Sequence, residues 1–128
     1  MSDESVNKVV LPDTDLHHLT SHSIPDQTFE ISVCLPPSYS SSPEKRYPVL
    51  YLLDGDFCLG MAIDIANYLR IGEYIPEILI VGVGYGTKLP PDQGGSNMRS
   101  RDFWPFSTES GTKSSGEVFR LFLEQELV

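Results

Sequence analysis

The stretch YPVLYLLDGDFCLG, residues 47–60, joins two apolar segments through Asp-Gly-Asp. Residues 49–53 are apolar at every position, which is typical of a strand covered on both faces by helices. Residues 57–71 are mostly apolar with a thin polar stripe and predict a well-buried helix. The continuous apolar run at 78–84 predicts a second buried strand. This order of strand, helix and strand predicts a βαβ unit whose two strands are parallel and adjacent.

An alternating segment precedes this unit. Residues 29–35 place Phe29, Ile31 and Val33 on one face, with polar side chains between them. That pattern predicts a strand with one solvent-exposed face, antiparallel and near an edge of the sheet. Residues 16–24 have weaker strand character, and residues 1–15 are polar and expected to be flexible.

The chain after the second apolar strand has a different composition. Residues 85–114 form a Gly-, Pro- and Ser-rich segment of 30 residues, which is long for a connection and therefore favours a functional role. Ser114 and Glu117 have the spacing of a capping box and predict the start of a last helix. Its apolar face is wide, and two strands can cover only part of it; the face comprises Val118, Phe119, Leu121, Phe122 and Leu123.

Composition excludes several function classes. The 128 residues carry a net charge of -9 and no basic cluster, so neither a nucleic-acid partner nor an anionic membrane surface is expected. The N-terminal ten residues lack the apolar core of a secretory signal, and no apolar run is long enough to span a bilayer. Cys34 and Cys58 form no CxxC pair and are expected to be buried free thiols, rather than a disulfide, in a cytoplasmic protein.

The Asp-Gly-Asp turn is a candidate oxyanion site. In serine hydrolases built on an α/β sheet, a backbone N–H after an early strand supplies one oxyanion donor. Gly55 permits a tight turn, so the N–H of Asp56 becomes the first candidate and that of Phe57 the second. Such a donor stabilises the transition state by about 3–4 kcal/mol. The alternative is an ordinary strand-to-helix turn in which Asp56 is the N-cap.

Four motifs together resemble one enzyme family. FEISVCLPPSY (29–39), RYPVLYLLDGD (46–56), ILIVGVGY (78–85) and RSRDFWP (99–105) follow the order of landmarks in the esterase D-type esterases. Within that family the chain is most similar to the enterobactin and bacillibactin esterases, which cleave siderophore trilactones. The resemblance covers about residues 16–127. It implies an α/β-hydrolase fold, a mixed sheet with two buried parallel central strands, and a serine nucleophile on a G-x-S-x-G elbow, followed by an acid and a histidine.

The chain departs from this family at the nucleophile, because G-x-S-x-G occurs nowhere in it. The resemblance therefore implies that residues 16–128 are the N-terminal half of the domain, truncated before the elbow, and no catalytic residue is assigned in this chain. The complete form is expected to hydrolyse a small-molecule carboxylic ester by acyl transfer to serine. Two alternatives remain: an inactive fragment that binds a partner or self-associates through an open sheet edge, and a binding module without chemistry.

The RSRDFWP motif supplies further candidates. The resemblance places it at the rim of the active site, where Arg99 or Arg101 would hold a substrate oxygen with its fork of donors. Asp102 would then fix the arginine or its own loop. The alternative is a loop-stabilising ion pair with Trp104 packed over it.

Three other patterns are weaker. His17, His18 and His22 lie in an extended segment with no carboxylate or cysteine to complete a ligand set, so no metal site is expected. GVGYGTK (82–88) matches neither a dinucleotide nor a phosphate-loop motif. Asp54 and Asp56 suggest an acid–base pair, but no sequence feature supports it. Neither a metal nor an organic cofactor is expected.

Overall fold

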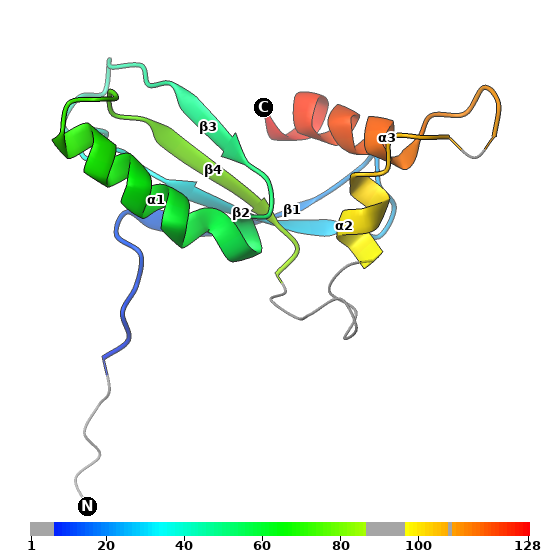
Figure 1. Cartoon of the computed structure of the whole chain (residues 1–128), viewed down its shortest axis with the longest axis horizontal. Helices are drawn as coiled ribbons and strands as arrows, with labels where there is room; N and C mark the ends of the chain where they lie inside the picture. Colours follow the sequence, from blue (N-terminus) through cyan, green and yellow to red (C-terminus); the bar gives the residue numbers. More distant parts are fainter. Residues whose placement is uncertain (1–6, 87–96, 108) are drawn as a thin grey trace, which may run out of the picture.

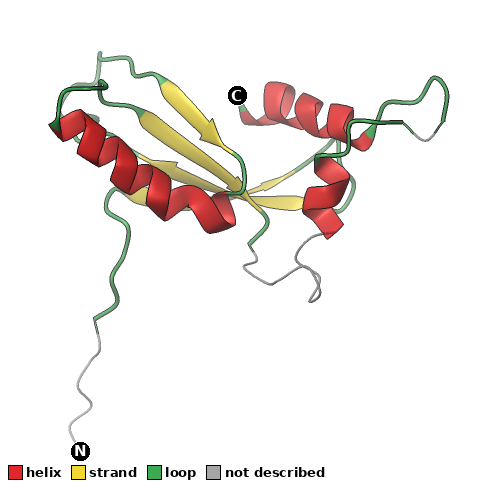
Figure 2. Cartoon of the chain, in the orientation of Figure 1, coloured by secondary structure: helices red, strands yellow, loops and turns green. Residues whose placement is uncertain are grey.

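A four-stranded mixed sheet organises the chain (Figures 1 and 2). The computed structural model describes residues 7–86, 97–107 and 109–128. Its elements are β1 (Thr14–Thr20), β2 (Thr28–Cys34), β3 (Val49–Leu52), α1 (Gly55–Ile71), β4 (Leu79–Gly84), α2 (Asn97–Asp102), α3 (Ser115–Phe122) and the π-helix η2 (Leu123–Leu127). Among these described helices, none is both long and apolar enough to cross a membrane.

The strand order is β1-β2-β4-β3. β2 pairs antiparallel with both β1 and β4, whereas β3 and β4 are parallel, with Leu50 opposite Ile80. The predicted βαβ unit, its parallel adjacent strands and the antiparallel strand near the edge are confirmed. This is the mixed α/β sheet expected from the sequence.

Alternate side chains of β4 serve two separate cores. Val81 and Val83 pack with Phe29, Phe119 and Phe122 on the α3 side. Ile80 packs with Leu59 and Ile63 of α1 on the other side. Because successive side chains of a strand point to opposite faces, α1 and α3 cover opposite faces of the sheet.

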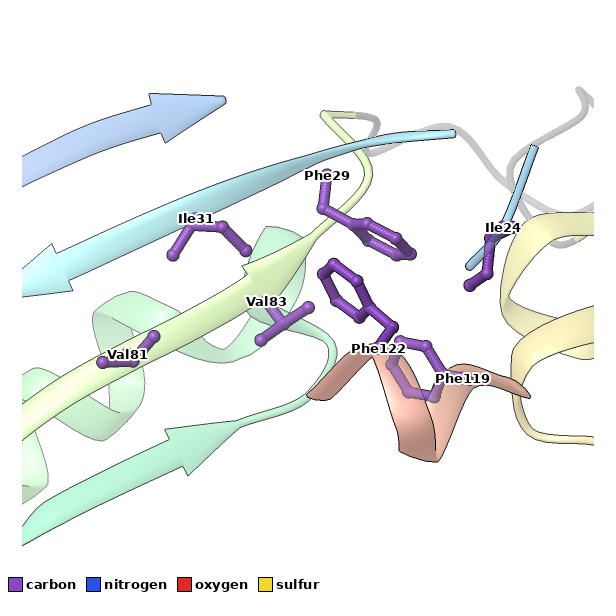
Figure 3. Packing of buried hydrophobic residues seen from close by; sticks show 7 residues of the cluster. All are labelled: Ile24, Phe29, Ile31, Val81, Val83, Phe119 and Phe122. Atoms are coloured by element: carbon purple, nitrogen blue, oxygen red, sulfur yellow. The ribbon is translucent and has the colours of Figure 1, made fainter. Parts of the chain in front are cut away.

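The α3 side is an aromatic core (Figure 3). The rings of Phe29 and Phe122 are both fully buried and stack with centroids 4.2 Å apart. The predicted capping box is confirmed: the Ser114 hydroxyl accepts from the Glu117 N–H, and the Glu117 carboxylate accepts from the Ser114 N–H. At the chain's end, Glu126 accepts from the N–H groups of His22 and Ser23. The C-terminal helical segment is thus held to the rest of the chain by the packing of α3 and by the Glu126 carboxylate of η2.

The burial predicted for residues 49–53 is wrong. β3 is one of the two edge strands, and Val49, Leu50 and Tyr51 are 44%, 42% and 40% exposed. Their register with β4 places Val49 and Tyr51 on the α3 side and Leu50 on the α1 side. Both faces of this strand are therefore uncovered by the described part of the chain.

The helix predicted at 57–71 is present as α1 but is not well buried. It begins at Gly55, and only Leu59 and Ile63 are buried. α1 contacts the sheet on one face alone, so its outward side chains reach solvent. The exposed apolar residues of α1 are Phe57, Met61, Ile65, Tyr68 and Ile71.

The segment 85–114 is not entirely a connection, because it contains α2. Residues 87–96 and 108 lie outside the described residues, and with them the end of the GVGYGTK pattern. Cys34 and Cys58 are free thiols, as expected, but both are half-buried rather than buried.

Candidate active site

The turn after β3 has an unusual backbone. Asp54 adopts the left-handed conformation, with φ 57° and ψ 38°, and is the N-cap of α1 without any capping bond from its side chain. The alternative that made Asp56 the N-cap is therefore wrong, since Asp56 lies inside the first turn of the helix. A non-glycine residue at positive φ persists only where its surroundings hold it, and such residues concentrate at functional sites.

The two candidate oxyanion donors differ in availability. The N–H groups of Phe57 and Cys58 both donate to the carbonyl oxygen of Asp54, at 3.0 Å. The N–H of Asp56 donates to no acceptor among the described residues. Of the predicted pair, Asp56 therefore has a free donor and Phe57 does not. Its role toward an oxyanion stays a prediction.

Glycines bring the turn against β4. A Cβ on Gly55 would lie 3.0 Å from the carbonyl carbon of Gly82 and from the amide nitrogen of Val83. A Cβ on Gly84 would lie 2.7–2.9 Å from the carboxylate of Asp56. A side chain at position 55 would push the start of α1 away from the backbone of β4, whereas a side chain at position 84 would displace the carboxylate of Asp56. The head of α1 is thus seated at the carboxyl ends of the two parallel strands, where α/β sheets usually place their ligand sites.

The carboxylate of Asp56 fixes the end of β4. It accepts from the N–H of Tyr85 at 2.6 Å and from the N–H of Gly86 at 2.9 Å. The Asp54 carboxylate is engaged separately, by Arg99. Asp54 and Asp56 therefore do not form the shared carboxylate pair that acid–base chemistry would need.

Arg99 connects α2 to the turn. Its Nε lies 2.7 Å from Oδ1 of Asp54 and its Nη2 lies 3.0 Å from Oδ2, a bidentate pair. The guanidinium also lies 4.8 Å from the ring centroid of Phe103. The hydrogen bond and the charge of Asp54 raise the pKa of Arg99 above its ordinary value. Two donors of this arginine are thus used within the chain.

Asp102 is the buried centre of a second network. It is 2% exposed and accepts from the Tyr85 hydroxyl at 2.6 Å. Nε and Nη2 of Arg101 donate to its two oxygens at 2.6 and 3.0 Å, and Nη2 also reaches Oε1 of Gln27 at 3.1 Å. Burial and the Asp102 carboxylate raise the pKa of Tyr85, so this phenol stays a donor. Asp102 therefore holds Arg101 and joins α2 to the end of β4.

An open groove adjoins the turn on the α1 side of the sheet. Its volume is about 620 Å³, within the range of small-molecule sites. Asp56, Phe57 and Met61 of α1 line it, opposite Leu11 and Leu16. The lining combines apolar side chains with three acidic residues: Asp56 in the first turn of α1, Asp15 on β1 and Glu30 on β2.

Among the residues that the structure describes, no hydrogen bond joins a serine hydroxyl to a histidine side chain. The hydroxyls of Ser23 and Ser38 are hydrogen-bonded to the carboxylates of Glu126 and Glu77 rather than to a histidine. Lys45 lies 3.4 Å from the Ser38 hydroxyl, but its hydrogen bond with Glu77 raises the pKa of Lys45 and keeps it protonated. No group of three potential metal ligands occurs in the described ranges.

Sequence reasoning missed three of the residues that build this site. Tyr85 directly follows β4, and its position at the end of the apolar run was the available signal for it. The sequence suggested Asp54 only as a member of an acid–base pair with Asp56, and it did not indicate the ion pair with Arg99. Gln27 is 74 residues away from Arg101, and nothing local indicates their contact.

Comparisons with known proteins bear on the family and the fold of the chain. The family described as "Putative esterase" matches residues 21–128. The BES protein from Bacillus cereus superposes with a TM-score of 0.70 at 23% identity, covering 95% of this chain and 46% of that one. The IroE-like serine hydrolase from Shewanella oneidensis gives 0.69 at 29% identity, covering 89% and 36%. The siderophore hydrolase EstB from Aspergillus nidulans gives 0.69 at 16% identity, covering 95% and 44%.

The chain thus spans less than half the length of these solved structures. No curated protein matches it. The match at 29% identity is to a serine hydrolase, whereas the matches below 25% bear on the fold alone.

Proposed function

Because the chain belongs to the Putative esterase family, we propose that it forms the N-terminal half of a carboxylic-ester hydrolase that acts by acyl transfer to serine. The observation that carries the proposal is the N–H of Asp56, which has no acceptor among the described residues and lies at the carboxyl end of parallel β3 and β4. A donor fixed there is available for a developing negative charge.

The chain's part in the reaction is electrostatic. A serine hydroxyl attacks the ester carbonyl carbon and loses its proton to a histidine, while the carbonyl oxygen becomes negatively charged. The Asp56 N–H donates to this oxygen as the charge develops. The alcohol then leaves with the proton, and water releases the acid by the same route. In this proposal the serine, acid and histidine come from a segment beyond Val128.

The substrate is proposed to be a small-molecule ester of the siderophore class. The names of the Aspergillus nidulans relatives support that class, and the volume of the groove beside the turn fits a small molecule. Direct binding of substrate by Arg99 or Arg101 has less support, because each already uses two donors on an aspartate. We place the protein in the cytoplasm, where its free thiols would persist, and assign it no cofactor.

Two experiments test the proposal. The reading frame of the gene beyond the codon for Val128 is expected to encode a strand, G-x-S-x-G and a later histidine. The encoded polypeptide should then hydrolyse p-nitrophenyl esters and lose this activity with a serine-directed phosphonate. A stop codon directly after Val128, or turnover that resists the phosphonate, would contradict it.

The exposed edge strand favours a second candidate function. β3 pairs with β4 on one side only, and three of its apolar residues are 40–44% exposed. An uncovered edge of this kind is a template for pairing with another strand. The chain would then be a self-associating module without chemistry. Light scattering over a concentration series separates the two: this candidate requires a concentration-dependent mass with no ester turnover, and Leu50→Lys should return the monomer.

A further inference from the structure

We propose that Arg99 is a positioning residue, which acts through Asp54 to hold the turn after β3 in the conformation that presents the Asp56 N–H. The use of that N–H rests on the proposed function. The conformational part of the inference stands on the geometry of the chain alone.

The Arg99–Asp54 contact restrains the turn after β3 relative to α2. The two nitrogen–oxygen distances are 2.7 and 3.0 Å, so the guanidinium plane and the carboxylate plane are fixed relative to each other. Phe103 lies against the guanidinium, 4.8 Å from its ring centroid. The partners are 45 residues apart, on α2 and at the head of α1. The pair therefore ties together two elements that are not neighbours along the chain.

Asp54 is the residue in the turn that needs such a restraint. It has φ 57°, yet it makes no capping bond with its side chain. Its carbonyl oxygen accepts from both Phe57 and Cys58 and so defines the first turn of α1. A return of Asp54 to negative φ would move that oxygen and redirect the peptide plane of Asp56. The conformation of Asp54 therefore sets the direction of the Asp56 donor.

The charge of the pair matters as well as its geometry. Asp54 lies two residues from the proposed donor, and a lone carboxylate there would repel a developing oxyanion. The guanidinium of Arg99 neutralises it. Removing Arg99 alone should therefore weaken stabilisation of the oxyanion more than removing the charges of both Arg99 and Asp54. This asymmetry separates positioning through Asp54 from a simple structural role of Arg99 in α2.

Arg101, the other arginine of α2, does not bind the turn as Arg99 does. Arg101 is bound to the buried Asp102 and to Gln27 rather than to a residue of the turn. The Asp56 carboxylate is bound to the N–H groups at the end of β4. Among the described residues, the Arg99–Asp54 pair is the ion pair that links α2 to the turn.

The experiment uses nuclear magnetic resonance on the whole 128-residue chain. The intraresidue HN–Hα cross-peak of residue 54 is strong only at positive φ, and the amide shift of Asp56 reports the peptide plane. Arg99→Gln should lower the left-handed population of residue 54 about two- to fivefold and shift the Asp56 amide. Asp54→Asn/Arg99→Gln should restore both signals, because asparagine tolerates the left-handed region and carries no charge. The matched control is Arg120→Gln, which removes another exposed, ion-paired arginine, that of the Arg120–Glu124 pair.

Two results would overturn the inference. One is an Arg99→Gln spectrum in which residues 54 and 56 are as little changed as in Arg120→Gln. The other is a double variant no closer to the wild type than Arg99→Gln. If Arg99→Gln does not fold, Arg99→Lys decides, since an ammonium cannot make the bidentate contact and should weaken the residue 54 signal. An unchanged signal in that variant would refute the inference. None of these spectra depends on ester turnover, so failure of the proposed function is recognised separately.

Discussion

Replacing Asp102 by asparagine tests the buried network that joins α2 to the sheet. The carboxylate is 2% exposed and accepts three hydrogen bonds, two from Arg101 and one from Tyr85. Removing one partner of a buried ion pair costs about 3–5 kcal/mol, because the other charge is left without compensation. The Arg101 side chain is 34% exposed and can regain water. We therefore expect a loss of about 2–3 kcal/mol in the free energy of unfolding.

Urea unfolding followed by circular dichroism measures this loss. With a slope of about 1–3 kcal/mol/M, typical of a small protein, the midpoint should fall by about 0.7–3 M. Asp64→Asn is the matched control, because Asp64 is exposed on α1, and its midpoint should change little. Arg101→Gln/Asp102→Asn should recover part of the loss, since neither charge remains. A midpoint for Asp102→Asn equal to that of Asp64→Asn would refute the reasoning.

Three further predictions concern the core, the last helix and pH. Phe122→Ala should lower the free energy of unfolding by about 3–5 kcal/mol, because the ring is fully buried; an unchanged denaturation midpoint would contradict this. Ser114→Ala should cost about 1–2 kcal/mol by removing the capping box of α3, and equal thermal midpoints would refute it. Hydrogen bonds from Lys45 and Ser38 lower the pKa of Glu77 from 4.5 to about 2. The contribution of ionised Glu77 to stability is therefore present above pH 4.5 and lost as the pH falls toward 2. In Glu77→Gln, the thermal midpoint should depend less on pH between 4.5 and 2 than it does in the wild type.

Local patterns predicted the central part of the fold. The alternation of apolar and polar residues at 29–35 identified β2, because such alternation follows from the geometry of a single strand. The apolar run at 78–84 identified the most buried strand, and the spacing of Ser114 and Glu117 identified the start of α3. Each of these signals lies within a few residues of the structure that it predicts.

Burial of residues 49–53 and 57–71 was predicted wrongly for a common reason. Apolar composition indicates that a surface favours contact, but it does not indicate which segment supplies the contact. β3 has a neighbour on one side only, and α1 contacts the sheet with one face. Their outward apolar side chains are therefore exposed in the described part of the chain.

The sequence predicted the position of the candidate site but not the contacts that hold its residues in place. The Asp-Gly-Asp turn could be recognised because it links an apolar strand to a helix. The positive φ of Asp54 could not, since aspartate tolerates but does not require that region. The pairs Asp54–Arg99 and Arg101–Gln27 join residues 45 and 74 positions apart, and a single sequence carries no signal for them.

The most direct test of the oxyanion donor compares Asp56→Pro with Asp56→Ala. Both lose the carboxylate, but only proline loses the backbone N–H, and proline is tolerated in the first turn of a helix. The host is a chimaera in which residues 21–128 replace the matched part of the Shewanella oneidensis serine hydrolase. We expect kcat for a p-nitrophenyl ester to be about 10²–10³-fold lower for proline than for alanine. Equal kcat values in two folded variants would contradict the assignment of the Asp56 N–H as an oxyanion donor.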